Sequence, residues 1–295
     1  MIPFRHTFRA MASPAEIQLY ASDQRQATRA ARAAQREVER IEAKYSRYRD
    51  DSVTSAINRA GDGVPVAIDE ETTALLDYAH ACWEQSDGLF DITSGVLRRA
   101  WNFKLEVIPR QSDIEALLDR VGWPRVRRDR GTAALEAGME LDFGGIGKEY
   151  AADRAVAMLL ESEIANALVN LGGDVRAIGS HPGGKPWHIG VVDPRQAGRS
   201  IAHVPIDNAG LATSGDYQRY MIHDGRRYCH VLNPRTGWPV EGPRSVSVIA
   251  PLCVVAGSCA TIAMLKGDNA QSYLEQQQLP YLLVDRQGTI SGTLR

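Results

Sequence analysis

Cysteine is scarce in this sequence, with four in 295 residues, and no two of them form a CxxC pair. No histidine cluster lies at metal-ligand spacing around them, so the spacing does not indicate a cysteine-based metal site. Cys253 and Cys259 fall in the apolar run PLCVVAGSCATIAML, which predicts buried free thiols. Nothing in this pattern requires an oxidising compartment.

Long apolar stretches and an excess of one charge are also missing. The apolar runs are shorter than the roughly 20 residues that span a bilayer, so we expect no membrane span. The start, MIPFRHTFRAMASPAEIQLY, lacks the apolar core of about seven residues that a signal peptide needs, which indicates a cytoplasmic protein. The net charge of −2 argues against a nucleic-acid partner recognised by bulk charge.

Helical and strand-like patterns alternate along the chain. Apolar residues at helical spacing predict helices at about 23–44, 69–86 and 112–120, and the third of these is entered through Ser112. FRHTFRAM and AEIQLY read as strands split by a Ser-Pro pair, and TAALEAGMELDFG also reads as strands. RYMIHDGRRYCHVL predicts a hairpin, because Asp224-Gly225 supplies a positive-φ turn.

These elements predict an α+β fold of largely antiparallel sheets with packed helices, because strand runs and hairpins are interleaved with helices. No linker is long enough to separate domains cleanly. We therefore expect a single domain over 1–295, with two intertwined lobes, helix-rich at 20–120 and strand-rich at 121–295, as the alternative division.

The segment LDFGGIGKEYAADRA, residues 141–155, places three glycines and Lys148 where a strand-like run passes into a helix. Glycines let the backbone approach a ligand closely, and the free N–H groups of a helix start suit an anion. The spacing matches neither GxGxxG nor GxxxxGKS/T, so neither standard nucleotide fingerprint applies. The segment is either a phosphate-binding turn or a tightly packed one, and spacing alone favours the second.

Thr213, Ser214 and His230 stand in segments that a hairpin could bring together. A single histidine at a strand end is more often a structural residue than a base. His230 nevertheless lies just before Asn233-Pro234, at a loop mouth where a general base is reachable. Both roles stay open on the residues alone.

Two further stretches have a structural and a ligand-binding interpretation. The glycine pair in NLGGDVRAIG, residues 170–179, favours a bulge or a close strand crossing over a ligand loop. Phe90 and Asp91 are equally consistent with a core aromatic beside a capping acid and with part of a site. The basic run LRRAW at 97–101 is expected on a solvated face.

The order of these motifs carries more information than any one of them. The chain resembles the ApbE-like FAD:protein FMN transferases, over about residues 7–295, through a series of segments in the same order. They are AMASPAEI, SRYRDDSVTSAINRAG, GLFDITSGVLRRAW, LDFGGIGKEYAADRA, NLGGDVRAIG, ATSGDYQRY, HVLNPRTGWPV and AGSCATIAMLKG. The resemblance implies the ApbE-like α+β fold.

It also implies an enzyme that binds FAD and, with Mg²⁺, moves FMN onto a threonine or serine hydroxyl of an acceptor protein, releasing AMP. The implied FAD contacts are Met11, Tyr48, Leu89, Phe90, Asp91, Asp142, Lys148 and His230. His230 is in addition the implied base, and the Gly145 carbonyl and Thr261 are the implied metal ligands. Many relatives are exported, so a periplasmic location is the alternative to a cytoplasmic one.

The chain departs from the family pattern in several places. Family members usually read MGT where this chain has Met11-Ala12-Ser13, which is a mild change. They usually have Gly where Glu149 stands, so that a carboxylate is placed near the implied phosphates. Asn233 stands where the family usually has Asp, which removes a charge near His230.

The largest departure is Gly257, which replaces the Asp of the family pattern AD-x-x-x-T. That Asp and the residue matching Thr261 both ligate the metal in the family. Mg²⁺ is normally held by at least one carboxylate, so we expect a weaker metal site here. Two alternatives therefore stay open beside the transferase: a non-catalytic FAD-binding protein and a metal-dependent FAD pyrophosphatase.

Overall fold

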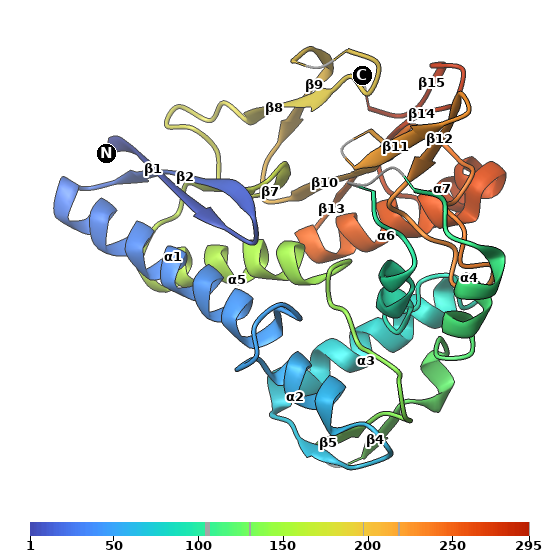
Figure 1. Cartoon of the computed structure of the whole chain (residues 1–295). Helices are drawn as coiled ribbons and strands as arrows, with labels where there is room; N and C mark the ends of the chain where they lie inside the picture. The colour runs from blue at the N-terminus through green and yellow to red at the C-terminus, as the bar shows by residue number, and fades with distance from the viewer. Residues whose placement is uncertain (104–106, 130, 197, 218, 295) are drawn as a thin grey trace.

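An eight-stranded sheet forms the centre of the fold (Figure 1). The computed structural model describes residues 1–103, 107–129, 131–196, 198–217 and 219–294. The strands, in their order across the sheet, are β1 (Ile2–Ala10), β2 (Ser13–Ala21), β6 (Ala167–Leu171), β7 (Asp174–Ile178), β10 (Gly210–Gly215), β13 (Ser245–Ala250), β14 (Tyr281–Val284) and β15 (Ile290–Gly292). Each neighbouring pair is antiparallel.

Three helices cover one face of this sheet: α1 (Gln24–Tyr45), α5 (Gly147–Glu161) and α6 (Cys253–Lys266) (Figure 1). Helix α1 begins at Asp23, whose side chain accepts a hydrogen bond from the amide of Gln26. The first half of its buried face is alanine, at positions 27, 30, 31 and 34, and α1 packs against α5. These helices carry most of the main hydrophobic core.

The opposite face of the sheet is covered by a separate hairpin, β8 (Trp187–Val192) and β9 (Ser200–Ile206). Trp187 and Val204 of this hairpin pack with Leu168 and Val175 of the sheet in a second apolar cluster. The central strands β6, β7, β10, β13 and β14 are therefore largely buried on both faces, whereas β1 keeps an exposed face.

The remaining elements are α2 (Val53–Ala60), β3 (Val66–Ala67), α3 (Glu70–Gln85), the 3₁₀ helix η1 (Ser94–Arg99), α4 (Gln111–Leu118), η2 (Trp123–Arg125), β4 (Arg127–Asp129), β5 (Thr132–Ala134), β11 (Tyr220–His223), β12 (Arg226–Cys229), η3 (Gly267–Asn269) and α7 (Ala270–Gln277). In Figure 1 most of them lie below and to the right of α5 and α6, with α2, β4 and β5 at the bottom and β11 and β12 near β14. Within the described part of the chain no helix is both long and apolar enough to cross a membrane.

The predicted α+β fold with largely antiparallel sheets is confirmed. The helices expected at 23–44 and 69–86 are present as α1 and α3. The expected hairpin is β11–β12, and Asp224 and Gly225 at its turn have φ angles of 49° and 72°. Cys253 and Cys259 are buried and free, as the apolar run predicts.

Several local predictions were wrong. The Ser-Pro pair does not divide the first two strands, because Ser13 begins β2 and the turn lies at Met11 and Ala12, with φ angles of 51° and 59°. Helix α4 begins at Gln111 with Arg110 at its cap rather than at Ser112. Residues 141–143 do not form a strand, although the amide of Asp142 does donate to the carbonyl of Ile92, at 2.8 Å.

Candidate active site

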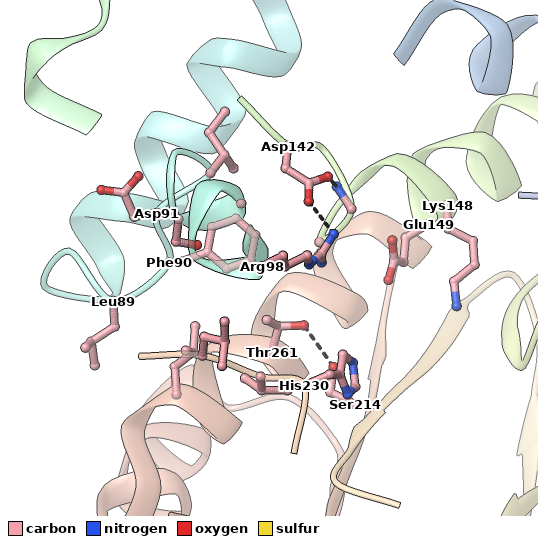
Figure 2. A pocket seen from close by; sticks show the side chains of 18 of the residues that line it. Leu89, Phe90, Asp91, Arg98, Asp142, Lys148, Glu149, Ser214, His230 and Thr261 are labelled. Atoms are coloured by element: carbon pink, nitrogen blue, oxygen red, sulfur yellow. Dashed lines mark hydrogen bonds and ion pairs between the residues drawn. The ribbon is translucent and has the colours of Figure 1, made fainter. Parts of the chain in front are cut away.

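A pocket opens where the segment 89–98, the 144–148 turn, the end of β10, the residues after β12 and helix α6 meet (Figure 2). The sequence places these segments far apart, and the fold brings them together at one end of the central sheet. All the predicted site residues except Met11 and Tyr48 line this pocket: Leu89, Phe90, Asp91, Asp142, Gly145, Lys148, His230 and Thr261.

The 144–148 turn is both tightly packed and open to the pocket. A methyl group at Gly145 would come within 3.1 Å of Cζ of Phe90, so the buried phenyl ring requires a glycine there. A methyl group at Gly144 would come within 3.0 Å of a carboxylate oxygen of Asp142, which accepts a hydrogen bond from the Gly144 amide at 2.9 Å. The two interpretations of the glycines are therefore compatible, because packing against Phe90 and Asp142 holds the turn at the pocket wall.

Asp142 joins this turn to two arginines. Its carboxylate lies 2.6 Å from Nη1 of Arg98 and 3.3 Å from Nη1 of Arg47, which also donates to the carbonyl of Gly95 at 3.0 Å (Figure 2). The prediction of a solvated face for the basic run 97–101 is confirmed for Arg98 and Arg99, which are exposed, although Asp142 also holds the Arg98 guanidinium at the pocket. Sequence spacing gave no signal for this contact, because Arg98 and Asp142 are 44 positions apart.

Lys148, Glu149 and Asp174 form a buried charged cluster on the other side of the turn. The Lys148 ammonium lies 2.6 Å from a carboxylate oxygen of Asp174, whose other oxygen accepts from the amide of Thr213 at 3.3 Å. Burial opposes the charge on Lys148, but Asp174 and Glu149 outweigh it and raise the Lys148 pKa. Burial and the Asp174 carboxylate raise the pKa of Glu149 to about 8.

Sequence reasoning missed Asp174. The glycine pair before it is neither a bulge nor a strand crossing, because Gly172 and Gly173 form the turn of the β6–β7 hairpin. This hairpin pairs Leu171 with Asp174 and brings Asp174 to Lys148. The signal was an acidic residue directly after two glycines, but its partner could be identified only from the sheet order.

His230 follows β12 and is half-buried in the pocket wall. Its Nδ1 lies 3.2 Å from the carbonyl oxygen of Arg219. Because a carbonyl only accepts, Nδ1 carries the hydrogen and the neutral ring keeps a free lone pair on Nε2. Burial and the nearby charges of Arg219, Arg98 and Lys148 lower the pKa of His230 to about 4, although the hydrogen bond to Arg219 opposes that shift.

Helix α6 supplies hydroxyl groups to the same pocket. The hydroxyl of Thr261 lies 2.8 Å from that of Ser214 at the end of β10 (Figure 2). The start of α6 is fixed by Asp153 of α5, whose carboxylate accepts from the amides of Cys253 and Val254, both at 2.9 Å. Helices α5 and α6 are thus locked together where their side chains enter the pocket.

Asp91 lies at the pocket, but its carboxylate is occupied by its own loop. It accepts from the amide and hydroxyl of Thr93, at 2.8 and 2.6 Å, and from the amide of Trp123, at 2.9 Å. Phe90 is buried in the main core. The interpretation of Phe90 as a core aromatic and Asp91 as a capping acid therefore agrees with their contacts. Leu89, which precedes them, lines the pocket.

Met11 and Tyr48 lie outside the pocket lining. Met11 is in the β1–β2 turn and packs partly buried against the main core. Ser13, the first residue of β2 after this turn, lies beside Gly172, and the Lys148 ammonium lies near Gly172 as well. Tyr48 is 78% exposed, with the Arg47 guanidinium carbon 5.4 Å from its ring centroid. Their contacts with a flavin stay predictions.

Comparison with known proteins identifies one family. The model of the ApbE family matches residues 11–283. An FAD:protein FMN transferase of Klebsiella pneumoniae is 33% identical over 247 residues, 81% of this chain and 75% of the relative. One of Treponema pallidum is 32% identical over 242 residues, 75% of this chain and 67% of the relative.

Solved structures give the same result for the fold. The ApbE protein of Thermotoga maritima has a TM-score of 0.91 and 32% identity, covering 99% of this chain and 97% of that one. The flavinyl transferase ApbE of Pseudomonas stutzeri has a TM-score of 0.89 and 26% identity, covering 99% of this chain and 95% of that one. With a family model that spans most of its length and relatives above 30% identity, the chain belongs to the ApbE family.

Proposed function

We propose that this protein is an FAD:protein FMN transferase, which moves the FMN half of FAD onto a threonine or serine hydroxyl of an acceptor protein. The observation that carries the proposal is that His230 and the 144–148 turn line one pocket, together with the cationic side chains of Arg98 and Lys148. Relatives that share about a third of its residues are FAD:protein FMN transferases.

The FAD diphosphate would lie against the 144–148 turn. Helix α5 begins there, and no side chain caps its first amides. Uncapped amides at a helix start bind anions through their N–H groups and the positive end of the helix dipole. Arg98 and Lys148 add positive charge on the two sides of the turn, so a doubly charged diphosphate fits this position.

His230 would take the proton of the acceptor hydroxyl. The threonine oxygen then forms a bond to the phosphorus of the FMN half, the bond from that phosphorus to the AMP oxygen breaks, and AMP leaves. Nε2 is the free ring nitrogen because Nδ1 is held by Arg219. A positioned base of this kind contributes roughly 10²–10⁴-fold to the rate. The bound diphosphate also brings negative charge near the imidazole, which raises its pKa toward neutrality.

The pocket offers oxygen donors for Mg²⁺. No three His, Cys, Asp or Glu side chains form a metal-binding group by themselves within the part of the chain that the structure describes. Mg²⁺ is usually held by one or two carboxylates together with phosphate and water oxygens. The Gly145 carbonyl, the Thr261 hydroxyl and the buried Glu149 carboxylate, whose Oε2 has no hydrogen-bond partner, fit that preference. When bound, Mg²⁺ would neutralise charge on the phosphates as AMP leaves.

Product analysis tests the proposal. The protein is incubated with FAD, Mg²⁺ and a candidate acceptor domain, and the mixture is analysed by mass spectrometry. A transferase adds the mass of FMN, less water, to one threonine or serine of the acceptor and releases AMP. Free FMN together with AMP would instead identify a pyrophosphatase. Unchanged FAD that stays bound to the protein would identify a flavin-binding protein without this activity.

A further inference from the structure

Glu149 of α5 occupies the space beside Gly257 of α6. A β-carbon built on Gly257 would lie 2.6 Å from Cγ, 2.9 Å from Cδ and 2.9 Å from Oε1 of Glu149. Atoms at these distances overlap, so a side chain at position 257 and the present position of Glu149 exclude each other. The absence of a side chain at Gly257 is therefore the condition for the Glu149 carboxylate to lie where it does.

One oxygen of the Glu149 carboxyl group is not satisfied by the protein. Its side chain is only 8% exposed, and its Oε2 has no hydrogen-bond partner among the residues described. The adjacent ammonium, Lys148, forms its ion pair with Asp174, at 2.6 Å. A buried polar atom without a partner is unfavourable, and in a folded protein such an atom can mark a position that a ligand or ion completes.

The surroundings of Glu149 suit a hard divalent cation. Thr261 lies one helical turn after Gly257 on α6, and its hydroxyl lines the same pocket as the Glu149 side chain. Gly145, four residues before Glu149, lines it as well. Figure 2 shows the Glu149 side chain entering the pocket from α5 and Thr261 entering from α6. A carboxylate, a hydroxyl and a backbone carbonyl that line one pocket can supply an all-oxygen donor set of the kind that Mg²⁺ and Mn²⁺ accept.

We infer that Glu149 supplies the carboxylate oxygen to the divalent cation of this pocket, and that the carboxylate has been exchanged between helices, from position 257 of α6 to position 149 of α5. The inference rests on the proposed function, since it assigns a metal ligand to the flavin site. In this inference Gly257 does not weaken the metal site, because the Glu149 side chain occupies the space that a side chain at position 257 would take. Glu149 and Gly257, the two departures from the family pattern, then belong to a single change.

Mn²⁺ binding in the presence of FAD tests this inference without measuring transfer. The amplitude of the free-Mn²⁺ electron paramagnetic resonance signal gives the affinity, and quenching of flavin fluorescence reports FAD binding in the same samples. We compare the wild type with Glu149→Gln and with the exchange variant Glu149→Gly/Gly257→Asp. Glu161→Gln is the matched control, because Glu161 is an exposed carboxylate at the far end of the same helix.

Glu149→Gln should weaken Mn²⁺ binding by at least about tenfold, since it removes a direct ligand and even outer-shell partners are worth 10–100-fold. The exchange variant should restore most of the affinity, and Glu161→Gln should leave it unchanged. Mg²⁺ should raise the Tm of the wild type, because it binds the folded state. This increase in Tm should be lost in Glu149→Gln and regained in the exchange variant. Gly257→Asp alone should lower the metal-free Tm, because its β-carbon overlaps Glu149.

Two results would overturn the inference while leaving the proposed function intact: FAD bound with no Mn²⁺ bound in the wild type, or equal Mn²⁺ affinities in the wild type and Glu149→Gln. A wild type that binds no FAD would instead remove the proposed function. If Glu149→Gln does not fold, the exchange variant decides, because a folded exchange variant that binds FAD without Mn²⁺ contradicts the inference, and one that binds both supports it.

Discussion

The ammonium of Lys148 lies 2.6 Å from the carboxylate of Asp174 at the wall of the pocket. Lys148 comes from the first turn of α5 and Asp174 from the first residue of β7, so the pair ties the glycine turn to the central sheet. The side chain of Asp174 is 4% exposed. The lysine is thus held in place by a buried acid before any nucleotide arrives, and the site is positioned by charges of both signs.

Removing this lysine should cost stability as well as affinity. We expect Lys148→Met to lower the free energy of unfolding by about 3 kcal/mol, because it leaves Asp174 as a buried carboxylate without its partner. Urea denaturation measures the change. Adding Asp174→Asn to the same chain should recover most of the loss, since the uncompensated charge is then gone. A double variant no more stable than the single one would contradict this account of the pair.

Arg98 and Arg99 provide a matched pair for the role of charge in binding. Arg98 lines the pocket beside Asp142, whereas Arg99 pairs with Glu140 and is not in the lining. We expect Arg98→Gln to raise the Kd for FAD by about tenfold or more, the value of a lost charge-assisted hydrogen bond, and to weaken its salt dependence. Arg99→Gln should change neither, as measured by titration of flavin fluorescence. Equal effects of the two substitutions would rule out a specific role for Arg98.

Two glycines of the turn should respond in opposite ways to alanine. Gly145→Ala places a methyl group 3.1 Å from Cζ of Phe90, which should cost about 1–3 kcal/mol of stability by overpacking. Gly147 is the first residue of α5, and a methyl group there would meet only Phe143 Cβ, at 3.8 Å. Gly147→Ala should therefore be neutral or stabilising by about 0.5–1 kcal/mol. Thermal unfolding separates the two, and Phe90→Leu should relieve the strain of Gly145→Ala.

The kcat/KM of transfer should fall only at low pH. Burial and neighbouring positive charges lower the pKa of His230 from 6.5 to about 4, so the imidazole of the free enzyme is neutral above that value and able to accept a proton. Because kcat/KM reports groups of the free enzyme, it should stay level as the pH falls to about 5 and decline only below that. Arg98→Gln removes one of the positive charges and should move the decline of kcat/KM to higher pH. A decline centred on the ordinary histidine pKa of 6.5 in the wild type would contradict the assignment of His230 as the base.

The lowered pKa of His230 also makes the stability of the fold depend on pH. A histidine whose pKa is lower in the folded state favours folding through its neutral form. The contribution of His230 is complete above the unfolded value of 6.5 and is lost as the pH falls from there to about 4. His230→Gln should flatten the decline of Tm over that range, which differential scanning calorimetry at several pH values would detect. An unchanged slope would show that the ring is not held neutral by the fold.

Local signals along the chain predicted the regular elements well. Apolar periodicity predicted α1 and α3, and Asp224-Gly225 predicted the β11–β12 turn. The Met11-Ala12 turn was missed, because both residues adopt a positive φ that neither type favours. There the pairing of β1 with β2 overrides local preference.

The site could be predicted only in part, for a related reason. The motifs located the glycine turn, His230 and Thr261, because each lies within a recognisable run. Asp174 and Arg98 acquire their roles from partners that the fold brings to them from distant parts of the chain. The contact between Glu149 and Gly257 joins two helices more than a hundred positions apart, and only the packing of α5 on α6 reveals it.

The most direct test of the central claim is a crystal structure of the His230→Ala variant with FAD and Mg²⁺, in which transfer should be arrested. We expect the diphosphate against residues 144–148, with Arg98 and Lys148 at its sides and the phosphorus of the FMN half facing position 230. FAD bound elsewhere on the molecule, or bound in this pocket with the diphosphate directed away from the glycine turn, would contradict the account.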